Sequence, residues 1–284
     1  MAFCSANENW AGYDASYQYN NNAYFTYAQA HFNLPDVHFN GPNGYDNIVV
    51  AWVGLGPYIP PTDAHGIWQA GVLAIDDPSY SVFFEDLGCT GPSVSGCPKP
   101  AGGSAGDPLF IKNLYVAPGD DVEVGVGASA GQGTYFVQDT TQGYYTGVVT
   151  FNPLEVKSDS TRNTPLTADA ADFIVEKTAK CDTQCDVQSM SQVHFYDALA
   201  QLSSGERRWL EQWKVTRYDL CTAYQSDYGH GNIPPPTHRI GLPSALIVDH
   251  GYYVAFDGTT GNTDCIQEGV RPSAALSWAI GEDG

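Results

Sequence analysis

A glutamine and a glutamate stand in two short phrases that are typical of β-strands. Gln69 lies in the apolar phrase Ile-Trp-Gln-Ala-Gly (67–71), and Glu176 ends the phrase Ala-Asp-Phe-Ile-Val-Glu (171–176). A glutamate in a buried strand is costly unless it is paired or functional, whereas a glutamine there presents a neutral amide donor. A carboxyl group and an amide that face one cleft could activate a water molecule and stabilise an oxyanion without serine, cysteine or metal. The two residues together therefore indicate hydrolytic chemistry.

The phrases around these two residues come in a fixed order along the chain. They occupy residues 9–12, 51–55, 69–71, 80–85, 118–124, 138–143 and 171–176. This ordered set resembles the glutamic peptidases (the eqolisins, peptidase family G1), which are secreted endopeptidases that act in acid. The resemblance covers roughly residues 8–200, with a weaker similarity at 243–265. It implies a sandwich of two antiparallel sheets and an acid peptidase activity that needs no cofactor.

The resemblance also implies roles for particular residues. Glu176 matches the general base, which takes a proton from water and returns it to the leaving amine. Gln69 matches the residue that positions the water and donates a hydrogen bond to the developing oxyanion. Trp52 matches a tryptophan that lines the cleft. Glu85 matches an acidic residue near the dyad, and its charge would raise the pKa of Glu176 by repulsion.

Two further residues are candidates for supporting roles. Asp172 precedes Glu176 by four residues and so shares its strand face, and Trp68 stands beside Gln69 as a candidate for substrate binding. Two acids that family members usually carry are missing. Leu-Gly-Pro fills 55–57, and Leu73 stands four residues after the glutamine. These differences leave the dyad intact but leave the pH optimum and the cleavage specificity open.

Other kinds of site find less support. The chain has no His-Glu-x-x-His, and its seven histidines are scattered, so we expect no metal site. Two alternatives stay open. One is a lectin-like carbohydrate-binding module, since 18 Tyr and six Trp could stack on sugars. The other is a retaining glycosidase, which would need Glu85 and Glu176 roughly 5 Å apart. The position of Gln69 distinguishes the peptidase from these two alternatives, because only the peptidase needs a glutamine beside Glu176.

Strand patterns dominate the chain and predict an all-β protein. Residues 48–53 form a continuous apolar run, which suits a strand buried on both faces, and residues 122–126 alternate with a period of two. Short strands with regular turns predict one domain over 5–284, a lectin-like (concanavalin-like) sandwich of two antiparallel sheets. One stretch differs. Capping-box spacing at 203–206, followed by apolar residues on one helical face, predicts a helix-plus-loop insertion at about 197–240.

The charge excludes some classes of partner. The 32 acidic residues outnumber the 12 basic ones and give a formal charge of −20, which argues against nucleic acid because phosphate binding needs clustered Lys and Arg. Adaptation to acid explains this balance, as does halophilic solvation. No run of 18 apolar residues could span a membrane. The resemblance to the glutamic peptidases implies that the substrates are proteins or peptides, and we expect a monomer.

Seven cysteines predict an oxidising, extracellular location. Local spacing favours the pairs Cys89–Cys97 and Cys181–Cys185, which would leave Cys221 and Cys265 to pair over a longer loop. The chain also lacks any Asn-x-Ser/Thr sequence, which favours a prokaryotic source over a glycosylated fungal one.

Overall fold

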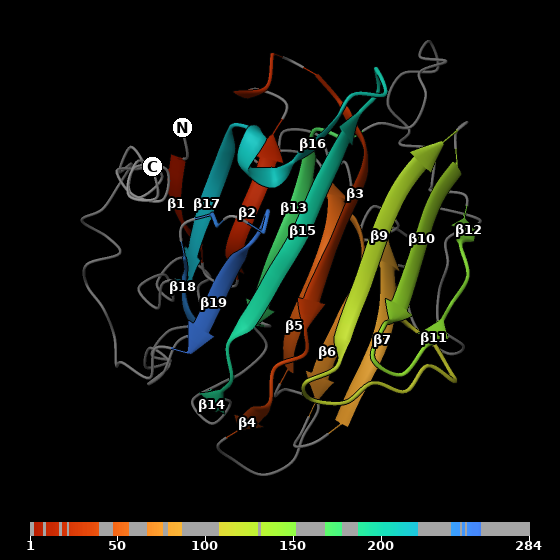
Figure 1. The fold of residues 1–284 in the computed structure, drawn as a ribbon, viewed down its shortest axis with the longest axis vertical. Helices are drawn as coiled ribbons and strands as arrows, with labels where there is room; N and C mark the ends of the chain where they lie inside the picture. Colours follow the sequence, from red (N-terminus) through yellow and green to blue (C-terminus); the bar gives the residue numbers. More distant parts are fainter. Residues whose placement is uncertain are drawn as a thin grey trace, which may run out of the picture.

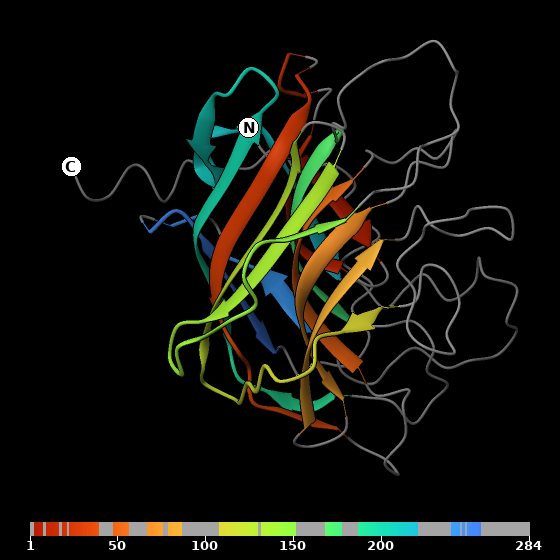
Figure 2. The same ribbon diagram turned by 90° about the vertical axis from the view of Figure 1, so that its right-hand side faces the viewer.

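Two large β-sheets stack face to face in the computed structural model, as Figures 1 and 2 show from two directions. The structure describes residues 3–7, 10–16, 19–21, 23–39, 48–56, 67–75, 79–86, 108–129, 132–151, 168–177, 187–220, 240–244, 246–247 and 249–256. Every pairing between these strands is antiparallel except that of β1 with β17. The predicted sandwich of two antiparallel sheets is therefore confirmed.

The eight-stranded sheet holds the strands that carry the candidate site. Its strands, in spatial order, are β1 (Phe3–Asn7), β17 (Val215–Leu220), β2 (Trp10–Ser16), β13 (Ala170–Lys177), β5 (Ile48–Gly56), β6 (Trp68–Ile75), β7 (Ser79–Asp86) and β8 (Leu109–Phe110). The central position of β13 is notable, because its neighbours β2 and β5 both come from the first part of the chain. Gln69 and Glu176 thus lie on strands of the same sheet.

The nine-stranded sheet forms the second layer. Its strands, in spatial order, are β11 (Tyr144–Tyr145), β10 (Gln132–Asp139), β9 (Asp121–Ser129), β3 (Phe25–Asn33), β15 (Val193–Leu202), β19 (Tyr252–Phe256) and β18 (Ile240–Pro243); β12 (Val149–Phe151) pairs with β10 and β16 (Arg207–Trp209) pairs with β15. A separate two-stranded sheet joins β4 (Val37–Phe39) to β14 (Val187–Met190).

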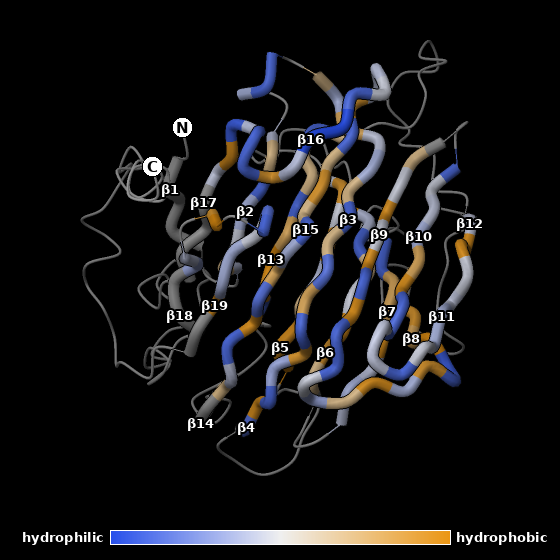
Figure 3. Tube along the Cα trace, viewed as in Figure 1, coloured by the Kyte–Doolittle hydropathy of each residue, from blue (hydrophilic) through white to orange (hydrophobic). Residues whose placement is uncertain are grey.

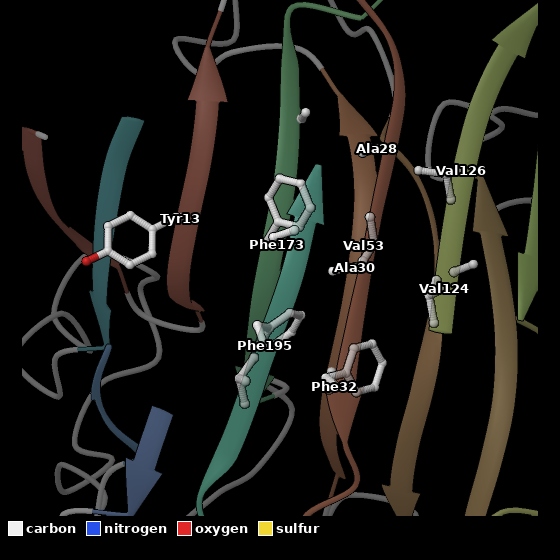
Figure 4. Close-up of a cluster of buried hydrophobic side chains, with 14 of the residues drawn as sticks. Tyr13, Ala28, Ala30, Phe32, Val53, Val124, Val126, Phe173 and Phe195 are labelled. Carbon is white, nitrogen blue, oxygen red and sulfur yellow. The ribbon is translucent and has the colours of Figure 1, made fainter. Parts of the chain in front are cut away.

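The core lies between the two sheets. Figure 4 shows Phe173 and Val53 of the eight-stranded sheet close to Phe32, Phe195 and Val124 of the nine-stranded sheet, and all five are fully buried. Along β3 the burial alternates residue by residue over most of the strand, because only one face of the nine-stranded sheet meets the core. Figure 3 shows the matching mixture of hydrophobic and hydrophilic residues along these strands.

The eight-stranded sheet is buried on both faces at its centre. Every residue of β5 after Ile48 is buried, as the apolar run at 48–53 predicted. Alternate residues of β5 (Val49, Ala51, Val53, Leu55) pack in the main core, whereas Val50 and Trp52 belong to a smaller apolar cluster on the opposite face. We call this opposite face the outer face, and it is where the candidate site lies.

The helix predicted within the insertion at about 197–240 is wrong over the described residues 197–220. The chain turns tightly after β15, where Gly205 has a φ of 89° and its N–H donates to the carbonyl of Leu202. It then forms β16, a short 3-10 turn (η3, Leu210–Gln212) and β17. The spacing that suggested a helix cap instead serves a hairpin turn, and β-favouring residues such as Val215 and Thr216 join the eight-stranded sheet. The remainder of the predicted insertion up to residue 239 lies outside the described residues. Within the described part of the chain, no helix has the length and apolar character needed to cross a membrane.

Candidate active site

Strand register places the side chains of Gln69 and Glu176 on the same face of the eight-stranded sheet. Glu176 lies directly opposite Val50 of β5, and Gln69 lies directly opposite Gly54 of β5. Directly opposed residues share a face, and so do alternate residues of one strand. Val50 belongs to the outer cluster, so both side chains belong to the outer face. The sequence prediction required them to share a face.

The two backbone positions are two strand spacings apart, with β5 between them, and are offset along the strands by the four residues from Val50 to Gly54. Ideal sheet geometry makes this roughly 10 Å across the strands and roughly 14 Å along them. The side chain of Trp52 lies between the positions of Gln69 and Glu176. A Cβ on Gly54 would lie 2.7 Å from Cζ3 of Trp52, so the indole covers Gly54. A water molecule shared by Gln69 and Glu176 stays a prediction that depends on the reach of the two side chains.

Two indole rings hold the carboxylate of Glu176. Nε1 of Trp52 donates a hydrogen bond of 2.9 Å to Oε2 of Glu176. Trp10 lies directly opposite Glu176 on β2 and is its second side-chain donor. The two indoles pack edge to face with their centroids 5.3 Å apart. Trp10 was not among the predicted site residues, although it stands in one of the phrases that carried the family resemblance.

An apolar setting dominates the electrostatics of Glu176. The outer cluster around it consists of Val50, Trp52, Leu73, Phe83 and Ile174. Burial, the largest influence, disfavours the charged carboxylate, and the two indole N–H groups only partly offset that effect. The charge of Glu85 adds repulsion, and together these influences raise the pKa of Glu176 to about 7. Glu176 can therefore change its protonation state at mild pH, as a catalytic acid or base must.

Gln69 is held by a different partner. It is buried and lies directly opposite Glu85 of β7, and its Nε2 donates a hydrogen bond of 2.6 Å to Oε2 of Glu85. A carboxamide carries two N–H groups. One is used in orienting the side chain, and the second can donate to a substrate. Glu85 thus contacts Gln69 directly and acts on Glu176 only through its charge.

The other predicted site residues divide between the two faces. Trp52 and Asp172 lie on the outer face, with Asp172 buried opposite Gly54. Trp68 lies on the opposite face, buried in the main core, so the structure does not bring it to the site. The six cysteines expected to form disulfides lie outside the described residues. Within the described part of the chain, no three His, Cys, Asp or Glu side chains form a group that could hold a metal ion.

Comparison with protein families identifies the class of protein to which this chain belongs. The model of the Peptidase A4 family matches residues 8–228, which is more than half of the chain. The chain therefore belongs to the Peptidase A4 family, the eqolisins, and is an enzyme of the glutamic endopeptidase class. No curated protein sequence matches the chain.

Solved structures share the fold at low sequence identity. Scytalido-glutamic peptidase with a transition-state analogue inhibitor matches with a TM-score of 0.57 and 18% identity, over 88% of this chain and 98% of that one. The same peptidase with a peptide-based transition-state analogue gives 0.56 and 17% over the same shares. SCP-B, an eqolisin in complex with the tripeptide Ala-Ile-His, gives 0.54 and 18%, again over 88% and 98%.

Proposed function

We propose that this chain is a secreted endopeptidase that hydrolyses peptide bonds in acid with a Gln69/Glu176 dyad. The observation that carries the proposal is that both side chains share the outer face while each has its own positioning partner. Trp52 holds the carboxylate of Glu176, and Glu85 holds the amide of Gln69. Groups that are fixed before the substrate arrives lose little energy to reorganisation when charge develops in the transition state.

The reaction divides between the two side chains. Ionised Glu176 takes a proton from a water molecule while the water oxygen attacks the carbonyl carbon of the peptide. The negative charge that develops on the carbonyl oxygen accepts a hydrogen bond from the second N–H of Gln69. Protonated Glu176 then gives its proton to the peptide nitrogen as the C–N bond breaks. The products are a carboxylic acid and an amine, and Glu176 is ionised again.

The charge of Glu85 is a smaller influence than burial on the pKa of Glu176, but it is the one that acid can remove. With a pKa of about 7, only about one Glu176 in a hundred would be ionised at pH 5. Protonation of Glu85 removes one of the influences that raise this pKa, so the base form of Glu176 becomes more accessible in acid. The acidic composition of the chain also favours an acid environment, because few basic groups limit self-repulsion there.

The test is the digestion of an unfolded protein substrate from pH 2 to pH 7 by the wild type and by Glu176→Gln. The variant keeps the size and the hydrogen-bonding capacity of the side chain but removes the base. We expect its turnover to collapse while its thermal unfolding stays close to that of the wild type. A Glu176→Gln variant that retains wild-type turnover would refute the dyad, as would activity that a metal chelator abolishes.

The two alternative functions gain no support from the geometry. Glu85 and Glu176 lie three strands and four residues apart, and Glu85 is engaged by Gln69. The carboxyl pair of a retaining glycosidase must lie about 5 Å apart. On the exposed face of the nine-stranded sheet, His31 stacks on Tyr196 at 4.9 Å and His194 stacks on Tyr253 at 4.1 Å. One face of each of these rings is therefore used within the protein.

A further inference from the structure

One histidine lies between two carboxylates on the exposed face of the nine-stranded sheet. His31 of β3 is directly opposite Glu123 of β9, and Asp121 precedes Glu123 by two residues and so shares its face. Nε2 of His31 lies 3.8 Å from Oε1 of Glu123, and Nδ1 lies 3.6 Å from Oδ2 of Asp121. The side chain of His31 is only 20% exposed. Each ring nitrogen therefore faces a carboxylate in a partly buried setting.

Further contacts fix the imidazole and one of the carboxylates. The hydroxyl groups of Tyr196 and Thr140 each donate a hydrogen bond of 2.6 Å to Oδ2 of Asp121. Tyr196 of β15 is directly opposite His31, and its ring stacks on the imidazole with the centroids 4.9 Å apart. We call His31, Asp121, Glu123 and Tyr196 the His31 cluster. It joins the three neighbouring strands β9, β3 and β15 (Figure 1).

The titratable groups around His31 are mostly acidic. Strand β9 contributes Asp121 and Glu123, and strand β15 contributes Tyr196, Asp197 and His194. The ring of His194 is 5.2 Å from that of Tyr196, and its Nε2 lies 2.5 Å from Oδ2 of Asp249. His194 therefore has a carboxylate of its own, and Asp121 and Glu123 are left to His31.

These surroundings favour the charged form of both partners. Burial lowers the pKa of His31, but the attraction of Asp121, Glu123 and Asp197 outweighs burial and raises that pKa above its usual value. Burial raises the pKa of Asp121, but its contacts with His31, Thr140 and Tyr196 outweigh burial and lower that pKa. The ion pair therefore exists over a wider range of pH than an exposed histidine and aspartate would allow.

The same kind of pair recurs at every histidine that the structure describes. Each has a carboxylate oxygen within ion-pair distance: Asp121 and Glu123 for His31, Asp36 for His38, Asp249 for His194 and Glu211 for His250. Histidine is the side chain whose charge ordinarily changes between pH 5 and pH 8. Pairs of this kind attract more strongly in mild acid, where the imidazole is protonated.

We propose that the His31 cluster is a pH-sensitive switch in the nine-stranded sheet, which holds β3 to β9 while His31 is protonated and weakens that contact once the proton is lost. The two strands also supply Phe32 and Val124 to the core that the sheets share (Figure 4). Loss of the proton would thus weaken the layer on which the sheet with the candidate site packs. The chain then has a preference for mild acid that is independent of the dyad.

Linkage gives the direction of the effect. A histidine whose pKa is raised by folding contributes stability that is fully present below its unfolded pKa, about 6.5, and is lost as the pH rises through its folded pKa. An aspartate whose pKa is lowered by folding contributes stability that is present above its unfolded pKa, about 4, and is lost as the pH falls through its folded pKa. The contact between His31 and Asp121 is therefore strongest between about pH 4 and pH 6.5.

The experiment compares urea unfolding of the parent chain and of His31→Gln from pH 5 to pH 9. Both proteins carry Glu176→Gln, which prevents self-digestion under the proposed mechanism and removes one carboxyl group of raised pKa. The pKa values of Asp172 and Asp139 are also raised, but these groups are present in both proteins, so their effect cancels in the ratio of the two folding equilibrium constants.

The proton resonance on Cε1 of His31 gives the pKa of His31 in the folded parent chain. We expect the ratio of parent to variant to fall as the pH rises above about 6.5, by tenfold for each unit by which that pKa exceeds 6.5. A ratio that does not change with pH would overturn the switch.

The same resonance tests the switch if His31→Gln does not fold. A pKa of His31 at or below about 6.5 in the parent chain would contradict the proposal. Asp121→Asn should lower this pKa, because an uncharged amide no longer attracts the imidazolium, and Glu123→Gln replaces Asp121→Asn if that variant does not fold.

His38 is the matched control, because it lies in the separate two-stranded sheet, and it should titrate as in the parent chain. If His31 also titrates as in the parent chain, Asp121 and Glu123 do not hold its proton and the switch is overturned. Neither measurement depends on peptidase activity, so the switch and the proposed function can fail separately.

Discussion

The indole Nε1 of Trp52 donates a hydrogen bond of 2.9 Å to the carboxylate of Glu176, and the far edge of the same ring covers Gly54. Gly54 is the residue directly opposite Gln69. One side chain therefore contacts the candidate base at one end and the strand position beside the candidate oxyanion donor at the other. Trp52 sets both the electrostatics of Glu176 and the shape of the surface between the two groups.

Substitution Trp52→Phe should move the acid limb of the pH–rate profile to higher pH. The hydrogen bond from Trp52 stabilises the ionised form of Glu176, so its loss raises the pKa of Glu176. We expect a shift of about one to two pH units, since a hydrogen bond to a charged group contributes about 1.5–3 kcal/mol. Trp68→Phe is the matched control, because Trp68 is buried on the core face, and should leave the limb in place. If the acid limb of the Trp52→Phe profile stays at the wild-type pH, Trp52 does not set the pKa of Glu176.

Substitution Gln69→Ala should lower kcat by about a hundredfold or more, because it removes a donor that acts on the transition state. The nine-stranded sheet supplies a matched control, since Gln29 donates its Nε2 to Glu123 just as Gln69 donates to Glu85. Gln29→Ala removes an equivalent amide–carboxylate contact and should leave kcat unchanged. Steady-state kinetics on one peptide substrate decide the matter, and equal losses in the two variants would argue for a purely structural role.

Substitution Glu85→Gln should move the acid limb to lower pH. The charge of Glu85 raises the pKa of Glu176, and an uncharged amide no longer does so. The glutamine oxygen can still accept the hydrogen bond from Gln69, so kcat at the optimum should change little. Glu123→Gln serves as the control on the other sheet. If Glu85→Gln instead abolished cleavage of a polysaccharide while Gln69→Ala had no effect, the enzyme would be a glycosidase.

Substitution Gly71→Ala should destabilise the protein and disturb Trp52. A Cβ at position 71 would lie 2.2 Å from the carbonyl oxygen of Ala51 and 2.8 Å from Cβ of Trp52. Overpacking of this kind costs about 1–3 kcal/mol. Chemical denaturation should show the loss of stability, and tryptophan fluorescence should report the displaced ring. Wild-type stability and wild-type fluorescence would mean that strands β5 and β6 accommodate the added methyl group without loss of stability.

The sequence patterns predicted the strands well where the burial of a strand follows from its own residues. The apolar run at 48–53 became β5, and the alternation at 122–126 became β9. The helix predicted within residues 197–240 was wrong because the apolar spacing there suits two structures, and distant strands decide between them. Val215, for instance, is directly opposed to Ala15, near the other end of the chain.

The site was predictable only in part for a similar reason. Period-two alternation already implied that the neighbours Trp68 and Gln69 must face opposite ways, so the core position of Trp68 was accessible from the sequence. The contact of Trp10 with Glu176, and the position of Asp14 directly opposite Asp172, were not. Both depend on the register between β2 and β13, and no local pattern fixes the register of two strands so distant along the chain.

The strand order also has a consequence for biosynthesis. β13 has β2 on one side and β5 on the other, so its neighbours are made long before it. A chain emerging from the ribosome carries Gln69 and the outer cluster residues Val50 and Trp52 well before Glu176 exists. Pairings between segments that are distant in sequence also form slowly, because the entropy of the closed loop is lost before the stabilising contacts form. Hydrolytic competence therefore arises late in synthesis, and the cell that makes the enzyme is exposed to it only after β13 has been completed.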